Sequence, residues 1–99
     1  MRIYKYPVGT TPGKCYIKAP FVKVLGVSLD ASENPFLYAI VDPNKGYNDD
    51  DTIYISTVWT GEEFGEFTAQ CKYLSTLTIG GLVCHYFAHG GRNGVLTGA

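Results

Sequence analysis

Short segments rich in β-branched and aromatic residues alternate along the chain with clusters of Gly, Pro, Asn and Asp. Antiparallel β domains have this pattern, because strands favour side chains that suit a pleated surface and turns favour residues that reverse the backbone. The pattern predicts an all-β or β-dominated α+β fold, either a compact antiparallel sandwich or a small barrel, of about six or seven short strands. The expected strands cover residues 2–6, 14–18, 21–29, 36–41, 52–60, 73–79 and 82–87.

The N-terminal segments differ in how they distribute their apolar residues. Segments 2–6 and 14–18 are joined by a Gly- and Pro-rich turn over residues 9–13, and we expect them to pair as a hairpin. Segment 21–29 suits one buried face, although Lys23 interrupts the series. The residues expected on that face are Phe21, Leu25, Val27 and Leu29.

The middle of the chain combines a wholly apolar segment with an alternating one. Segment 36–41 is apolar at every position, which is typical of a strand covered on both faces. A polar loop over residues 42–51 leads into segment 52–60, whose alternation predicts a half-buried strand with Trp59 inside. The sequence Thr60-Gly61-Glu62-Glu63 has the form of a capping box, and apolar residues follow it at helical spacing. One short helix near residues 62–71 is therefore expected.

The clearest local signal is a C-terminal hairpin that turns at Gly80-Gly81. If Ile79 faces Leu82, then the pairs further along the hairpin follow from the antiparallel register. The residues expected on its core face are Tyr73, Leu77, Ile79, Leu82, Cys84 and Tyr86. The residues expected on its other, wetter face are Leu74, Thr76, Thr78, Val83, His85 and Phe87, with His85 opposite Thr76.

Composition limits the organisation and the location of the chain. With 99 residues, 45% of them hydrophobic, it can form one compact core, which we place at residues 1–88, followed by a flexible Gly-rich tail at 89–99. The formal net charge of -1 provides no long-range field for nucleic acid, and no apolar run or leader-like start indicates a membrane or secretion. We therefore expect a cytoplasmic protein with no membrane partner, for which nucleic acid is an unlikely partner.

Three widely spaced cysteines suggest reduced thiols rather than a disulfide framework. Cys84 is interpreted as a small core residue, because it lies in an apolar strand pattern. The histidines and the acidic loop at 42–51 lack the spacing of a metal site, and the chain contains no nucleophile elbow or phosphate-binding loop. We predict no catalytic residue, no cofactor and no metal, and an enzyme is the third hypothesis, since no cleft with paired acids can be identified.

Several of these segments together resemble a known family. The residues are Lys5-Tyr6-Pro7 near the start, Leu37-Tyr38-Ala39-Ile40-Val41-Asp42-Pro43 in the middle, and Gly80-Gly81-Leu82-Val83-Cys84-His85-Tyr86-Phe87 near the end. The chain resembles small uncharacterised phage and prophage proteins, classified only as a domain of unknown function. The resemblance implies a phage or a phage-carrying bacterium as the source, members that end near Phe87, and no catalytic residues.

Aromatic residues are the remaining candidates for function, because tyrosine is enriched at binding surfaces. Tyr4 and Tyr6 share one face of the first strand, while His85 and Arg92 offer stacking and anion contacts. The leading hypothesis is a non-enzymatic phage protein, a counter-defence inhibitor that binds and occludes a bacterial host protein through an edge strand or a tyrosine-bearing face. The alternative is an oligomer that sequesters a small nucleotide-like signal, and a minor RNA-binding role shares third place with the enzyme. Exposed strand edges also favour a homodimer.

Overall fold

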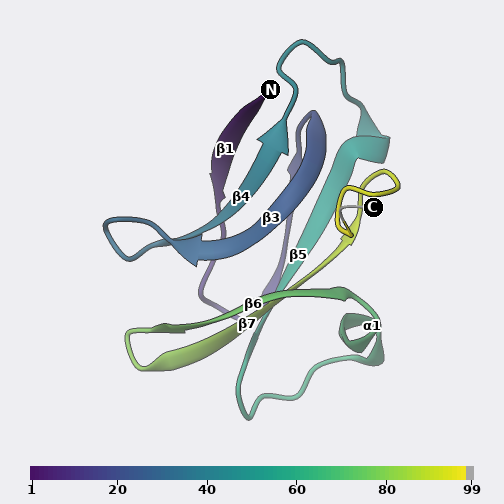
Figure 1. Cartoon of the computed structure of the whole chain (residues 1–99). Helices are drawn as coiled ribbons and strands as arrows, with labels where there is room; N and C mark the ends of the chain where they lie inside the picture. The colour runs from purple at the N-terminus through teal and green to yellow at the C-terminus, as the bar shows by residue number, and fades with distance from the viewer. Residues whose placement is uncertain (98–99) are drawn as a thin grey trace.

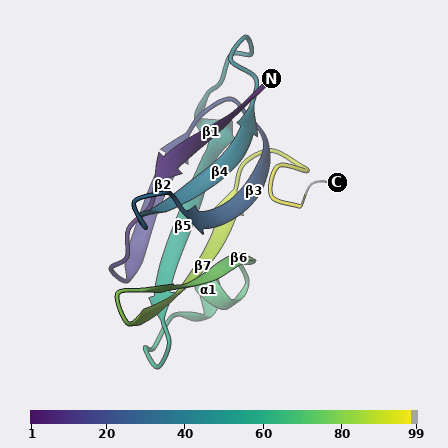
Figure 2. The same cartoon turned by 60° about the vertical axis from the view of Figure 1, so that its left-hand side comes forward.

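Seven β-strands form two antiparallel sheets in the computed structural model, which describes residues 1–97 (Figures 1 and 2). The three-stranded sheet has the strand order β1-β4-β3, and the four-stranded sheet has the order β2-β5-β7-β6. The strands are β1 (Arg2–Pro7), β2 (Gly13–Lys18), β3 (Phe21–Leu29), β4 (Pro35–Val41), β5 (Thr52–Trp59), β6 (Lys72–Ile79) and β7 (Leu82–Gly90). The helical elements are the 3₁₀ helix η1 (Asp49–Asp51) and the α-helix α1 (Glu66–Ala69). The predicted β-dominated antiparallel fold is confirmed.

The two sheets pack face to face, and their inner faces form one hydrophobic core. The three-stranded sheet contributes residues such as Phe21 and Leu37, and the four-stranded sheet contributes Ile55, Tyr86 and the predicted core thiol of Cys84. One side of this sandwich is closed where β3 lies against β6, since the Val27 N–H donates to Ser75 Oγ at 3.0 Å. Within residues 1–97 the strands form two stacked sheets rather than a closed barrel.

The C-terminal hairpin has the predicted register. Ile79 pairs with Leu82 and Leu77 pairs with Cys84. The one departure is a β-bulge between Tyr73 and Ser75, which moves Tyr73 to the outer face, where its ring contacts that of Phe87 at 5.8 Å. Leu74 packs against the core instead. An extra residue in one strand reverses the alternation beyond it, so the predicted positions of these two residues were wrong.

The predicted hairpin between the first two strands does not form. β1 pairs with β4, and β2 pairs with β5 in the other sheet. The segment between them crosses from one sheet to the other and is held by side-chain donors from β5 and β7. The Tyr86 hydroxyl donates to Gly9 O at 2.8 Å, and the Trp59 Nε1–H donates to Thr10 O at 2.6 Å. The segment predicted to be a short hairpin turn therefore connects the two sheets instead.

Strands β3 and β4 also differ from their predicted burial. Two register shifts in β3 space its buried residues three apart, at Phe21, Val24 and Val27, and leave Leu25 49% exposed. β4 is buried on one face, whereas the outer face carries half-buried side chains. No further layer of the described residues packs on the outer face of this sheet. Its central strand is therefore fully covered on the inner face alone.

Segment 60–71, here called the strap, crosses the outer face of the four-stranded sheet. Its helix α1 has four residues and begins after Gly65, so the expected helix is present but much shorter than residues 62–71. The capping box lies elsewhere, at Asn48 and Asp51 of η1. Because the strap covers β5, Ser56 and Val58 are buried on a face that the alternation predicted to be exposed.

The chain beyond residue 88 differs from the expected tail. β7 continues to Gly90, and the following residues fold back onto the sandwich, where Val95 is buried and its carbonyl accepts from the Val24 N–H at 2.8 Å. Arg92 forms an ion pair with Asp51. These contacts hold the Gly-rich segment after Gly90 against the sandwich, although its composition predicted a flexible tail. Residues 98 and 99 of the predicted tail lie outside the described residues.

Gly90 permits the close approach that begins this return. Its φ is +89°, and a Cβ atom there would lie 2.7 Å from Thr52 O. Gly61 has a similar φ of +87°, but a Cβ atom at that position would meet nothing within 4 Å. We expect Gly61→Ala to lower the free energy of unfolding by about 1 to 2 kcal/mol, from backbone strain alone. Gly90→Ala should cost about 3 kcal/mol or more, because the backbone must also move.

Urea denaturation followed by the fluorescence of Trp59, the one tryptophan, measures both variants. Equal losses for the two alanines would contradict the contact with Thr52.

Candidate functional site

The side of the sandwich opposite the β3–β6 contact is bordered by two edge strands. β1 is the outer strand of one sheet and β2 is the outer strand of the other. Figure 2 shows both along the same side of the molecule. Among the described residues neither strand pairs on its second edge, so backbone N–H and C=O groups point outward there.

Tyrosines gather along this side, and we call the surface formed by Tyr4, Tyr6, Tyr16 and Tyr47 with the two edge strands the tyrosine edge. Tyr6 is half-buried, and its ring packs edge-on against Phe21 at 5.7 Å. Burial raises the pKa of the Tyr6 hydroxyl, with further contributions from Tyr4 and Tyr47. Tyr47, in the loop before η1, is exposed and also contributes to the raised pKa of Lys18 on β2.

A hollow of about 460 Å³ adjoins the tyrosine edge on the outer face of β2 and β5. Tyr16 and Tyr54 form its walls, and Lys18 and Asp49 lie at its rim. The Lys18 Nζ donates to Asp49 Oδ1 at 2.7 Å, and this hydrogen bond lowers the pKa of the Asp49 carboxyl and raises that of Lys18. The hollow has aromatic walls and an ionic rim, which is the composition of a site that accepts a side chain of a partner.

A row of rings continues from this hollow across the four-stranded sheet to α1. The Tyr16 and Tyr54 rings are 6.4 Å apart, Tyr54 stacks on His89 at 4.8 Å, and Phe67 meets His89 edge-on at 4.7 Å. The Lys14 Nζ lies 4.6 Å from the centre of the Phe67 ring, within the range of a cation–π contact. These contacts join side chains of β2, β5, β7 and α1 in one row.

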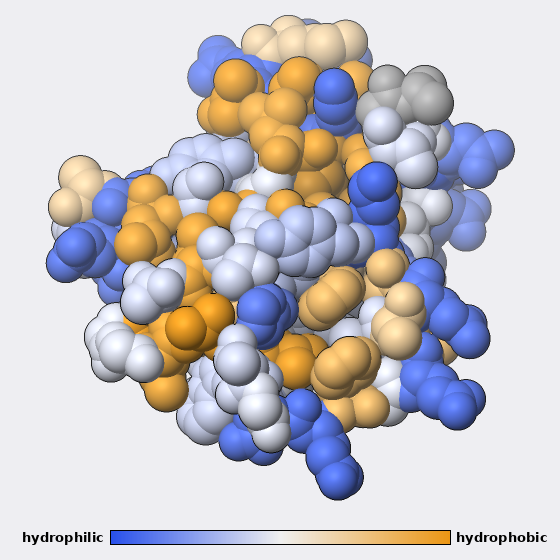
Figure 3. All heavy atoms as spheres, turned by 60° about the horizontal axis from the view of Figure 1, so that its bottom comes forward, coloured by the Kyte–Doolittle hydropathy of each residue, from blue (hydrophilic) through white to orange (hydrophobic). Residues whose placement is uncertain are grey.

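His85 lies on the same outer face, between two hydroxyl groups. Thr60 Oγ1 lies 2.6 Å from its Nε2 atom, and Thr76 Oγ1 lies 2.9 Å from its Nδ1 atom. The residue opposite His85 in the register is Thr76, as the hairpin predicted. A hollow of about 410 Å³ beside His85 has walls of Trp59 and Phe87. In Figure 3, which brings the end of the molecule with the strap forward, hydrophobic side chains reach the surface among hydrophilic ones.

Arg92 has a structural role. Its Nε donates to Asp51 Oδ1 at 2.9 Å, and its Nη2 donates to Asn48 Oδ1 at 3.2 Å. The hydrogen bond from Arg92, together with the Asn48 N–H, lowers the pKa of the Asp51 carboxyl. Asp51 is 1% exposed, so the guanidinium compensates a buried charge and ties the C-terminal segment to η1.

The four predicted site residues therefore lie in three places. Tyr4 and Tyr6 belong to the tyrosine edge, His85 lies on the outer face of the other sheet, and Arg92 is bound to Asp51. Sequence reasoning missed Tyr16, Tyr47 and Tyr54 as members of a surface. For Tyr54 the signal was present in the sequence, because it alternates with the buried Ile53 and Ile55 and must therefore point outward.

Neither a metal-binding cluster nor a membrane-spanning helix is present within residues 1–97. No group of three or more His, Cys, Asp and Glu side chains within residues 1–97 is arranged to hold a metal ion. Nor does any helix in that range have the length and apolar character to span a membrane.

Fold and surface define the chain as a small antiparallel β-sandwich with two open edges on one side. It belongs to a family described as a domain of unknown function (DUF7352), whose model matches residues 1–94. The match extends past Phe87, so the expectation that members end near that residue was wrong. No curated protein and no solved structure matches the chain.

The ring row makes a prediction about pH. Burial, with a smaller contribution from Lys14, lowers the pKa of His89 below its usual value of about 6.5. The unfolded chain then binds a proton at a higher pH than the folded chain does. Stability should fall as the pH drops from about 7 to about 5, and His89→Gln should flatten this dependence.

Urea denaturation at several pH values measures the slope. The lowered carboxyl pKa values of Asp30, Asp49 and Asp51 place their contributions at a lower pH, outside this window. An unchanged slope in His89→Gln would show that the imidazole is not responsible.

Breaking the ion pair between Arg92 and Asp51 should lower stability more than breaking the exposed pair between Lys18 and Asp49. Arg92→Gln leaves the Asp51 carboxylate buried without a cation, and we expect a clear fall in melting temperature. Lys18→Gln removes the partner of Asp49, whose side chain is 93% exposed, and should have little effect. Adding Asp51→Asn to Arg92→Gln should recover part of the loss. Equal melting temperatures for the two single variants would contradict the structural role of Arg92.

Proposed function

We propose that this protein is a non-enzymatic binding module that attaches to another protein through the tyrosine edge. The observation that carries the proposal is that β1 and β2 lie on one side of the sandwich, each with one edge that no strand of the described residues pairs, and with exposed tyrosines beside them. An edge strand offers a ladder of backbone donors and acceptors to an incoming strand, and alternate side chains then provide specificity. Tyrosine adds a large contact area at a low cost in side-chain entropy.

The charges along this side favour an acidic partner. Arg2, Lys5, Lys14 and Lys18 lie on the two edge strands, and they are four of the eight basic residues of the chain. Lys5 and Lys18 have carboxylate partners at 3.4 Å and 2.7 Å, while no ion pair with a described residue involves Arg2 or Lys14. Positive groups around an aromatic centre speed association with a negative surface and select against other partners.

The biological setting of the proposal is a phage protein that works in the cytoplasm of a bacterial host. The resemblance to small phage and prophage proteins supports this setting. A protein that occludes the working surface of a host defence protein needs shape complementarity and no bond-breaking chemistry. Counter-defence inhibition is therefore the specific purpose we propose for the tyrosine edge.

A small planar anion is the second candidate ligand. The ring row favours it, because Tyr54 stacks on His89 and Lys14 and Lys18 lie at either side of the row. In that case the protein would sequester a nucleotide-like molecule on the outer face of the four-stranded sheet. Arg92 would not cooperate with His85 in such a site, since its guanidinium is engaged by Asp51.

Replacing tyrosines tests the proposal against a matched control. Tyr16→Ala and Tyr4→Ala should each weaken capture of a host protein from bacterial lysate by about tenfold or more, because truncating a central aromatic residue removes a hot spot. Tyr73→Ala is the control, since Tyr73 is also exposed (53%, against 69% for Tyr16) but lies on β6, at the opposite edge of the sheet.

The experiment compares affinity-tagged variants by quantitative mass spectrometry and then measures the affinity of the purified pair. Native mass spectrometry of the same samples detects a co-purified nucleotide or a dimer. The proposal fails if no protein is captured reproducibly, or if the control loses the partner as readily as Tyr16→Ala does. A bound nucleotide without a protein partner would favour the second candidate.

A further inference from the structure

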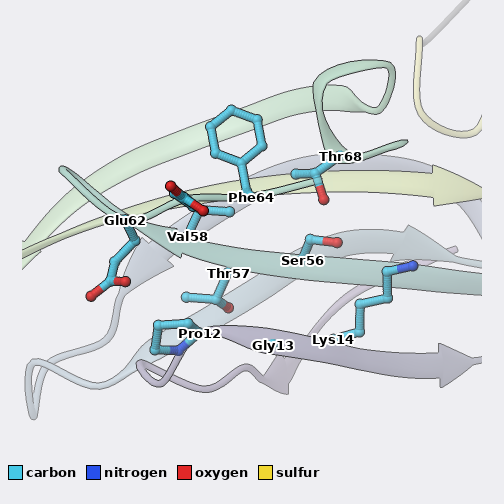
Figure 4. Close-up of a pocket in the computed structure, with 10 residues that line it drawn as sticks. Pro12, Gly13, Lys14, Ser56, Thr57, Val58, Glu62, Phe64 and Thr68 are labelled. Atoms are coloured by element: carbon cyan, nitrogen blue, oxygen red, sulfur yellow. The ribbon is translucent and has the colours of Figure 1, made fainter. Parts of the chain in front are cut away.

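A third hollow lies beneath the strap, and Phe64 lines both this hollow and the one beside His85. Its volume is about 240 Å³, and it lies between the strap on one side and β2 and β5 on the other (Figure 4). Gly13 contributes no side chain to its rim, which keeps the hollow open beside Lys14. None of the tyrosines of the tyrosine edge lines it.

The floor of this hollow contains an unsatisfied polar atom. Ser56 is 3% exposed, and within the part of the chain that the structure describes its Oγ is a buried side-chain oxygen with no hydrogen-bond partner. Buried hydroxyl groups are normally paired, because desolvation without a partner is unfavourable. Thr68, also buried, lines the same end of the hollow from α1. Two hydroxyl-bearing side chains, one of them without a hydrogen-bond partner among the described residues, therefore line this hollow.

The two ends of the hollow have opposite charge. Lys14 lies beside Ser56 and Thr68, whereas Glu62 lies at the other end, as Figure 4 shows, and Glu63 also lines the site. Among the described residues none of these three charged groups forms an ion pair. Between the ends, Val58 and Phe64 provide an apolar wall.

We propose that this hollow binds a compact zwitterion of about the size of a dipeptide. Lys14 with the hydroxyl groups of Ser56 and Thr68 would hold a carboxylate, since charge-assisted hydrogen bonds are the strongest of their kind. Glu62 and Glu63 would hold an ammonium group, and Phe64 would cover an apolar side chain. A nucleotide does not fit this arrangement, because the two glutamates repel a polyanion. The inference does not rest on the proposed function, since the two surfaces share Lys14 and otherwise have different linings.

Titration with L-alanyl-L-leucine, followed by amide chemical shifts, tests the inference on the full chain. We expect saturable shifts at millimolar concentrations, largest at residues 14, 56 and 68. Ser56→Ala and Lys14→Gln should each weaken binding by about tenfold, the loss typical of a hydrogen bond to a charged group. Lys72→Gln is the control, because Lys72 is exposed at the start of β6 and does not line the hollow.

Two derivatives of the dipeptide separate the charged ends. The N-acetyl compound lacks the ammonium group and the C-terminal amide lacks the carboxylate, so each should bind about tenfold more weakly than the parent. Glu63→Gln should reduce the difference between the parent and the N-acetyl compound. Ser56→Ala also removes an unpaired buried hydroxyl, so its melting temperature without ligand should equal or exceed that of the unmodified protein.

Three results would overturn the inference. They are the absence of saturable shifts, shifts centred away from the strap, and equal binding by the parent and both derivatives. None of these results depends on capture of a host protein, so the inference and the proposed function can fail separately.

Discussion

The crossing between β1 and β2 depends on a hydrogen bond through the core. The hydroxyl of Tyr86, on the inner face of β7, donates to Gly9 O at 2.8 Å, and Trp59 holds the next carbonyl. Burial raises the pKa of Tyr86, which keeps the hydroxyl protonated as a donor. Because the segment is fixed between the layers, β1 and β2 join different sheets and each becomes an edge. The open side that we propose as the binding surface is therefore a consequence of an interaction in the core.

The outer face of the four-stranded sheet has a cover that the three-stranded sheet lacks. The strap contributes Phe64 and Phe67, which contact Phe87 and His89 at 6.4 Å and 4.7 Å. These contacts bury Ser56 and Val58 from the solvent side and leave the two hollows that Phe64 lines. The strap contains a helix of only four residues and is held mainly by these ring contacts. It therefore leaves space that a longer, well-packed helix would fill.

Sequence reasoning succeeded where structure is local. The register of the C-terminal hairpin follows from the two glycines at its turn and the alternation on each side, and it correctly places His85 opposite Thr76. The alternation gave the wrong faces for Tyr73 and Leu74, because the bulge after Tyr73 adds one residue to the strand and so exchanges its inner and outer positions. The composition of the segment does not indicate this bulge. Two similar shifts in β3 exposed Leu25 and buried Val24.

Features that depend on distant partners could not be predicted. The return of the chain after Gly90 relies on Asp51, 41 positions before Arg92, and a Gly-rich composition gives no sign of that pairing. The tyrosine edge arises in the same way, since β1 with Tyr4 and β2 with Tyr16 lie along one side of the molecule only when the two sheets stack. Of its members, the sequence indicated Tyr4 and Tyr6, because their shared face on one strand is a local property.

The lysines on the open edges also bear on self-association, which exposed edges would otherwise favour. Antiparallel pairing of β1 with β1 of a second copy would bring the two Lys5 side chains toward each other across a two-fold axis. Pairing of β2 with β2 of a second copy would do the same for Lys14 and Lys18 of the two chains. Lysines on edge strands oppose such pairing, because like charges facing each other are destabilising. The same groups attract a negatively charged strand. The charge pattern of the edges thus supports the acidic partner that we propose, rather than a second copy of this chain.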